Sequence, residues 1–161
     1  SHHVAPPGFE DAVFQIMAAG YVPVITHPER LVWIEDHYPT FVTLARRGCW
    51  LQLTAGALVG KFGKRARHWS ERLLGDGVVH LVASDAHTVS VRSPRMSDAI
   101  PLLERLVGVE ETARLLRGRP QAILDDVAPD HVPPPPGLAQ PTPDATPARG
   151  GLARLRRLLS R

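Results

Sequence analysis

The chain has 161 residues, a hydrophobic fraction of 43% and a formal net charge of +3. This is enough for one domain with a hydrophobic core, and the single cysteine excludes an internal disulfide framework. No apolar run reaches the ~20 residues that span a bilayer and no signal peptide is visible, so we expect a cytoplasmic protein. Residues 1–129 hold fourteen basic and fourteen acidic residues, so the positive charge comes from residues 130–161. We therefore expect no nucleic-acid partner.

Apolar spacing and turn residues predict helices and strands that alternate. Strands are expected over residues 22–26, 50–54 and 78–83, and helices over 7–19, 39–47, 62–73, 96–107, 109–116 and 120–124. Strands that alternate with helices favour right-handed βαβ units and a parallel sheet. The fold class is therefore α/β.

The composition changes after residue 126. Seven of the sixteen prolines lie in residues 130–161, which predicts an extended, solvated Pro-rich linker over residues 127–150. Residues 151–161 form a basic amphipathic tail with leucines on one helical face and arginines on the others. A helix of about two turns is marginal in water, so we expect a disordered tail. Weak contact with an anionic membrane surface or a partner is the alternative.

Two short motifs follow the first and third predicted strands: His27-Pro28-Glu29-Arg30 and Ser84-Asp85-Ala86-His87. The carboxyl ends of parallel strands meet at one edge of a sheet, so we expect His27, Asp85 and His87 to converge on a metal site. Pro28 predicts an extended His27. An extended segment would place Asp85 and His87 on the same side of the chain. Mixed imidazole and carboxylate ligands suit Mn²⁺, Fe²⁺ or Zn²⁺ better than Ca²⁺.

Two arginines, Arg30 and Arg92, lie a few residues after these expected ligands. A guanidinium group is always charged and binds phosphate oxygens in pairs. Metals lower the pKa of bound water, and arginines offset the charge that develops on phosphate. Each motif alone is better explained as a turn, a cap or surface residues than as a catalytic site. Their placement at two strand ends favours a metal-dependent hydrolase of anionic substrates.

Other conspicuous residues have simpler interpretations. Cys49 lies in an apolar stretch and is expected to be buried, and His80 is expected to be a core or sheet histidine. His2 and His3 resemble metal ligands, with loop residues as the alternative. Four cations, Lys61, Lys64, Arg65 and Arg67, are most simply the solvated face of a helix, with attraction of an acidic substrate as a secondary role.

The sequence resembles the PHP superfamily (polymerase and histidinol phosphatase), and more narrowly the bacterial tyrosine phosphatases of capsule and exopolysaccharide operons. The similarity is carried by residues 27–30, 51–63, 81–87 and 92–99, and it covers about residues 1–125. It implies a distorted (β/α)7 barrel, a cluster of up to three metals, commonly manganese, and hydrolysis of phosphotyrosine. The typical substrate is the tyrosine kinase that controls polysaccharide polymerisation and export.

Matched residue by residue, the resemblance makes His27, Asp85 and His87 metal ligands, and Arg30 and Arg92 the phosphate-binding arginines. The family opens with an HxH metal motif that this sequence lacks. We therefore expect residues 1–126 to be the C-terminal portion of the barrel, without the N-terminal half, and the isolated chain to be weakly active or inactive. Two alternatives are a phosphoesterase of a small metabolite such as histidinol phosphate and an inactive fragment that only binds a partner.

Overall fold

A small parallel sheet organises the structure, which is a computed structural model that describes residues 2–90 and 94–139. Its strands are β1 (Val24–Thr26), β2 (Trp50–Thr54) and β3 (Leu81–Ala83), in the order β1-β2-β3. Thr26 pairs with Gln52, and Thr54 pairs with Ala83, so the three strands end at the same edge. The expected α/β class and parallel pairing are confirmed.

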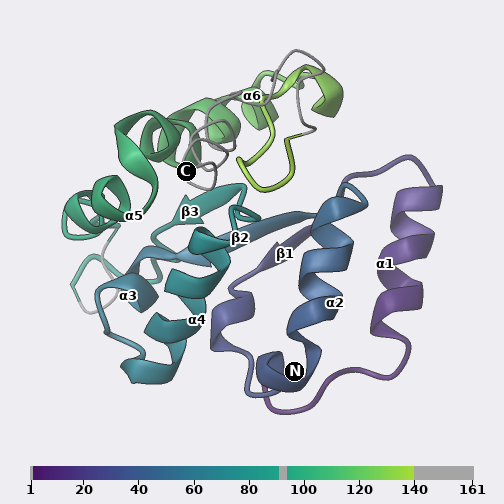
Figure 1. Cartoon of the computed structure of the whole chain (residues 1–161), viewed down its shortest axis with the longest axis horizontal. Coiled ribbons are helices and arrows are strands. Elements are labelled where there is room, and N and C mark those ends of the chain that lie inside the picture. The colour runs from purple at the N-terminus through teal and green to yellow at the C-terminus, as the bar shows by residue number, and fades with distance from the viewer. Residues whose placement is uncertain (1, 91–93, 140–161) are drawn as a thin grey trace, which may run out of the picture.

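Helices surround the sheet in chain order, from α1 and α2 beside β1 to α5 and α6 beside β3 (Figure 1). No helix in the described ranges has the length and apolar character needed to cross a membrane. The helical elements are α1 (Phe9–Ala18), η1 (Pro28–Arg30), α2 (Ile34–Arg46), α3 (Ala55–Leu58), α4 (Gly63–Gly75), α5 (Ile100–Ala113), η2 (Arg114–Gly118), α6 (Arg119–Leu124) and η3 (Pro129–His131).

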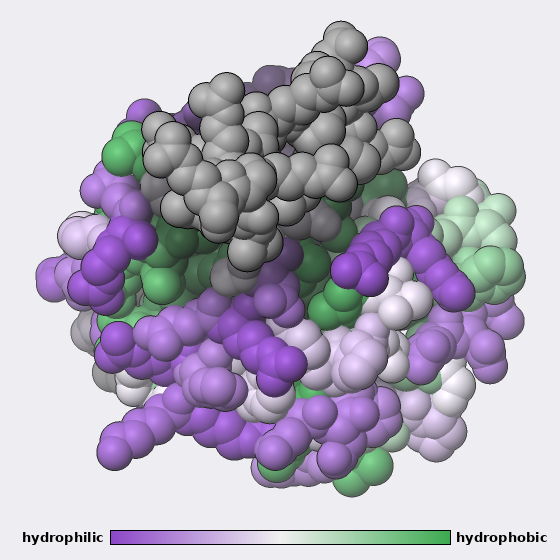
Figure 2. Space-filling model, in the orientation of Figure 1, coloured by the Kyte–Doolittle hydropathy of each residue, from purple (hydrophilic) through white to green (hydrophobic). Residues whose placement is uncertain are grey.

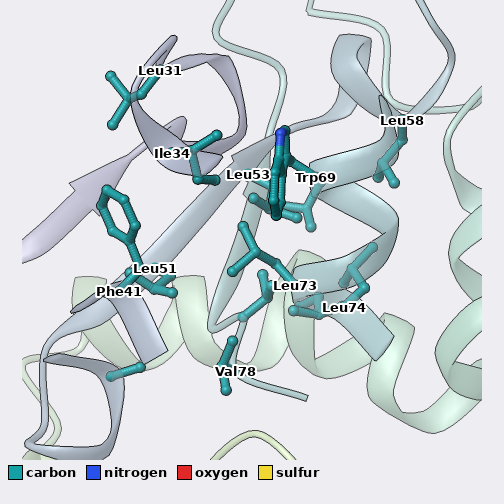
Figure 3. Close-up of a cluster of buried hydrophobic side chains, with 14 of the residues drawn as sticks. Leu31, Ile34, Phe41, Leu51, Leu53, Leu58, Trp69, Leu73, Leu74 and Val78 are labelled. Atoms are coloured by element: carbon teal, nitrogen blue, oxygen red, sulfur yellow. The ribbon is translucent and has the colours of Figure 1, made fainter. Parts of the chain in front are cut away.

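The main core lies between β2 and the helices α2 and α4 (Figure 3). β2 contributes Leu51 and Leu53, which are fully buried, and Phe41 and Leu73 pack on them from the two helices. Burying each such side chain contributes about 1.5–3 kcal/mol. This core fixes the carboxyl end of β2, which is the centre of the site described below.

Tertiary packing moves several expected boundaries. α2 begins at Ile34, so Pro39 lies inside the helix, although proline removes a backbone hydrogen bond there. Ile34 and Tyr38 are buried, and their packing holds the first turn.

Two other boundaries also differ. β1 is shorter than expected because Pro23 has no N–H to donate, although the Pro23 carbonyl still accepts a hydrogen bond from the Trp50 N–H (2.9 Å). The two expected helices on either side of Gly108 form α5 with a kink at that residue (φ 83°).

The first part of the expected linker is not solvated as predicted, because residues 129–139 pack against the strands and helices that precede them. Val132 joins Trp50 and Leu81 in a second cluster, and the Arg119 Nε–H donates to the carbonyl of Pro133 (2.9 Å). The Gly137 N–H donates to the carbonyl of Gly77 (3.0 Å). A Cβ at Gly137 would lie 2.0 Å from the Asp76 carbonyl oxygen, so this close approach requires glycine. Composition alone cannot reveal such a partner surface.

The rest of the expected linker and the expected tail over residues 151–161 lie outside the described residues.

The interpretations of Cys49 and His80 as buried residues are confirmed. Cys49 is fully buried, and burial raises the pKa of its thiol to about 11, which suits a core residue and not a nucleophile. His80 is 5% exposed and stacks on Trp50, with ring centroids 5.1 Å apart.

Candidate metal and phosphate site

The two strand-end motifs meet across the carboxyl end of β2. The His27 N–H continues the strand pairing to the carbonyl of Gln52 (2.8 Å) and leads the chain into η1. From η1, the Arg30 guanidinium donates to the Asp85 carboxylate, with 2.9 Å between Nη1 and Oδ2. Both side chains are about one-fifth exposed, at 18% and 23%. The ion pair therefore joins the segment after β1 to the segment after β3.

Both motifs turn sharply where extended chain was expected. His27 has φ 43° and Asp85 has φ 51°, in the left-handed region that non-glycine residues rarely adopt. The prediction of an extended His27 is wrong because the Arg30 N–H bonds back to the His27 carbonyl (3.0 Å), so the chain must reverse at His27. Strained residues of this kind concentrate at functional sites.

The His87 imidazole is oriented by the backbone carbonyl of Asp85. Its Nδ1 lies 2.8 Å from the carbonyl oxygen of Asp85, so Nδ1–H is the donor and the Nε2 lone pair faces away from that bond. The same Nδ1 is 3.9 Å from the carboxylate Oδ1 of Asp85. Asp85 and His87 are thus neighbours because of a turn, not because of extended alternation.

His27 supplies a third potential donor. Its Nδ1 is buried and has no hydrogen-bond partner among the described residues. Burial, and then the nearby Arg30 cation, lowers the pKa of His27 below its ordinary value, which keeps the imidazole neutral. The ring of His2, for which the sequence left open a ligand or a loop residue, lies beside the His27 ring, with the two ring centroids 4.9 Å apart.

Glu29 is the site residue that the sequence analysis missed. Its side chain is fully buried, and its Oε1 accepts the Thr54 N–H at the end of β2 (2.8 Å). Its Oε2 has no partner among the described residues. Burial raises the pKa of Glu29 to about 7. Glu29 therefore fixes η1 against β2, and the only sequence signal for this role is its position between His27 and Arg30.

Arg30 is supported on its other side by an aromatic ring. Its guanidinium carbon lies 4.2 Å from the centroid of Phe62, which is a favourable cation–π distance. Phe62 in turn lies against Gly56, where an added Cβ would be 2.9 Å from the ring. Gly56 therefore lets Phe62 approach, and Phe62 and Asp85 together hold Arg30.

A pocket of about 260 Å³ opens beside this arginine. It is lined by His2, Glu29, Arg30, Phe62, Arg65 and Ala66. Arg65 is held by hydrogen bonds to the carbonyls of Leu31 (3.0 Å) and Val32. Larger hollows lie elsewhere, for example one of about 560 Å³ between α1 and the end of α2, but no strand-end residue lines it.

The expected ligands fit a divalent transition metal in chemistry but do not form a finished site. Within residues 2–90 and 94–139, no three His, Cys, Asp or Glu side chains are grouped closely enough to hold a metal. The structure brings Asp85 and His87 together and leaves His27 as a separate donor with an open nitrogen. Arg92 lies outside the described residues. Full coordination at these donors requires further ligands.

Fold and site together define a parallel α/β protein whose strand ends carry imidazoles, carboxylates and an oriented arginine. Residues 7–125 match the family described as Capsular polysaccharide synthesis, CpsB/CapC. The chain belongs to this family.

Named relatives agree with this assignment. The chain is 38% identical over 101 residues to the tyrosine-protein phosphatase YwqE of Bacillus subtilis, covering 63% of this chain and 40% of YwqE. It is 29% identical over 135 residues to the tyrosine-protein phosphatase CpsB of Streptococcus pneumoniae, covering 78% of this chain and 54% of CpsB. The chain thus spans about half the length of these relatives.

A solved structure gives the same result. It comes from work on YwqE of Bacillus subtilis and CpsB of Streptococcus pneumoniae, described as unique metal-dependent tyrosine phosphatases. It superposes on this chain with a TM-score of 0.73 and 32% sequence identity, over 80% of this chain and 51% of the solved chain. The described fold is therefore similar to about half of that structure.

Proposed function

We propose that this chain carries the phosphate-binding part of a metal-dependent protein-tyrosine phosphatase of capsule or exopolysaccharide synthesis. The observation that carries the proposal is the Arg30–Asp85 ion pair, which joins the two strand-end motifs in a member of the CpsB/CapC family. We place the three-stranded sheet within a distorted (β/α)7 barrel. The enzyme acts in the cytoplasm, with which the single, buried Cys49 is consistent.

Each site residue has a proposed role. His27, Asp85 and His87 hold a divalent metal, with Mn²⁺ preferred over Fe²⁺ and Zn²⁺. When bound, such a metal would supply hydroxide near neutral pH, because it would lower the pKa of bound water. Arg30, held between Asp85 and Phe62, uses its remaining N–H groups to bind the phosphoryl oxygens and offset their charge. Arg92 is proposed to bind the same phosphate.

The proposed substrate is a phosphotyrosine in a protein, most specifically a bacterial tyrosine kinase that controls polysaccharide synthesis. The pocket beside Arg30 has an apolar wall in Phe62 and Ala66, which suits the ring of a tyrosyl phosphate. A small phosphorylated metabolite and partner binding without catalysis are the competing functions.

A fusion protein tests this choice. The part of Bacillus subtilis YwqE that precedes the matched region would be joined to residues 1–139 of this chain. With Mn²⁺, we expect the fusion to hydrolyse a phosphotyrosyl peptide faster than histidinol phosphate, and the 161-residue chain alone to be weakly active or inactive. Asp85→Ala with His87→Ala should abolish the activity, whereas His68→Ala with His131→Ala, two exposed histidines, should not.

Faster turnover of histidinol phosphate would favour the metabolite phosphoesterase. A folded fusion protein that hydrolyses neither substrate would favour the binding function. Normal turnover by the unfused chain would refute the expectation that it lacks part of the metal site.

A further inference from the structure

One strongly charged surface is not used by the proposed chemistry. We define the α4 basic surface as four exposed cations in the first turns of α4 and just before it: Lys61, Lys64, Arg65 and Arg67. Residues 37–70 contain no Asp or Glu, whereas residues 1–129 as a whole are electrically neutral. Hydrophilic residues gather over the part of the molecule where α4 lies (Figure 2). The α4 basic surface is therefore a local concentration of positive charge.

The charge of the two lysines has no structural explanation within the described residues, whereas both arginines have partners. Arg67 forms an ion pair with Glu71 one turn later (2.8 Å). The Arg65 guanidinium donates hydrogen bonds to the backbone carbonyls of Leu31 and Val32. In the ranges 2–90 and 94–139, no ion pair involves Lys61 or Lys64. Their position is also unfavourable for the helix, because the amino end of a helix carries partial positive charge and α4 has no acidic residue in its first turn. An external anion would offset this repulsion.

The surface adjoins the pocket beside Arg30, the proposed phosphate site. Phe62, Arg65 and Ala66 come from the same segment as the two lysines and line the pocket together with Arg30. α4 packs directly on η1, the element that carries Arg30. A peptide whose phosphotyrosine enters the pocket would therefore pass its neighbouring residues over Lys61 and Lys64.

We infer that the α4 basic surface binds acidic residues that flank the phosphotyrosine, and so selects acidic phosphotyrosine segments. The inference rests on the proposed function, because it takes the pocket beside Arg30 as the phosphate site. The two lysines attract the flanking carboxylates through screened electrostatic interactions, each of modest strength. Arg65, already oriented by its carbonyl partners, links the surface to the pocket.

Peptide binding to the 161-residue chain tests this inference. Three fluorescent peptides would be compared by anisotropy: a phosphotyrosyl peptide with Glu on both sides, the same peptide with Ala in place of Glu, and the acidic peptide without phosphate. We expect the acidic phosphopeptide to bind about five-fold more tightly than the neutral one at low salt. The difference should disappear at ~0.5 M NaCl.

Lys61→Ala with Lys64→Ala should remove most of this preference and leave the neutral phosphopeptide unaffected. The matched control is Arg46→Ala with Arg47→Ala, two exposed arginines at the end of α2, away from the strand-end site. This control should bind all three peptides like the original chain. Circular dichroism verifies that both variants are folded.

The possible results separate the inference from the proposed function. Equal binding of the acidic and neutral phosphopeptides, or equal effects of the two double variants, would overturn the inference alone. Equally tight binding of the unphosphorylated acidic peptide would also overturn it, because the surface would then be a general polyanion site. Binding of no peptide would contradict the proposed phosphate site and the inference with it.

Discussion

Replacement of Glu29 by glutamine should reduce the loss of unfolding free energy that occurs as the pH rises from 5 to 8. The carboxyl of Glu29 is fully buried, and burial raises its pKa from 4.5 to about 7. Its neutral form is therefore favoured by folding. The stability that it contributes is fully present below pH 4.5 and is lost as the pH rises through about 7. Glutamine keeps an acceptor for the Thr54 N–H and does not titrate.

The size of the effect follows from the two pKa values. With 4.5 in the unfolded chain and about 7 in the folded chain, ionisation of Glu29 costs roughly 3 kcal/mol at pH 8 and less than ~1 kcal/mol at pH 5. The packing cost of the new amide is the same at both pH values. The variant should therefore gain about 2.5 kcal/mol of unfolding free energy, relative to the original protein, between pH 5 and pH 8.

Urea unfolding followed by tryptophan fluorescence measures this difference. Trp33, Trp50 and Trp69 are all buried and report on the transition. The titration should be done with a metal chelator present. Glu104→Gln, an exposed position on α5, is the matched control and should show no such trend. If the gap between Glu29→Gln and the original protein stays constant within ~0.5 kcal/mol over this range, Glu29 is not held in a low-dielectric environment.

Two further predictions concern side-chain contacts. Phe62→Ala removes the ring beneath Arg30, so we expect the active fusion protein to lose about tenfold in kcat/KM for a phosphotyrosyl peptide. Phe62→Tyr should retain the activity; similar losses in both variants would contradict the stacking role. Arg119→Met removes the shorter ion pair of the buried Glu111 carboxylate (2.7 Å), leaves it only the longer one to Arg114 (3.6 Å), and should cost about 3 kcal/mol in urea unfolding. Adding Glu111→Leu should restore much of that loss, and an additive decrease would contradict the ion-pair explanation.

The parts of the fold that depend on local pattern could be predicted from the sequence. The three strands and their parallel order follow from short apolar runs separated by helical spacing, and β2 matches its expected limits. The meeting of the segments that follow β1 and β3, seen in the Arg30–Asp85 ion pair, follows from parallel topology, which places strand ends at one edge. This convergence needs no knowledge of side-chain packing.

Other features depend on contacts between distant residues and leave little trace in the sequence. The left-handed turn at His27 arises from two hydrogen bonds that close around it. The role of Glu29 depends on the backbone of Thr54, and the support of Arg30 by Phe62 depends on space at Gly56. The packing of Val132 needs a surface formed by the starts of two strands. None of these partners is visible from composition or periodicity.

Manganese binding tests the central claim most directly, namely that the motifs after β1 and β3 form one metal site beside Arg30. Free Mn²⁺ would be titrated with the 161-residue chain and measured by electron paramagnetic resonance. We predict a weak site whose affinity falls at least ~10-fold in Asp85→Ala with His87→Ala, and likewise in His27→Ala, but not in His68→Ala with His131→Ala. Unchanged Mn²⁺ uptake in the Asp85 and His87 double variant would contradict the claim.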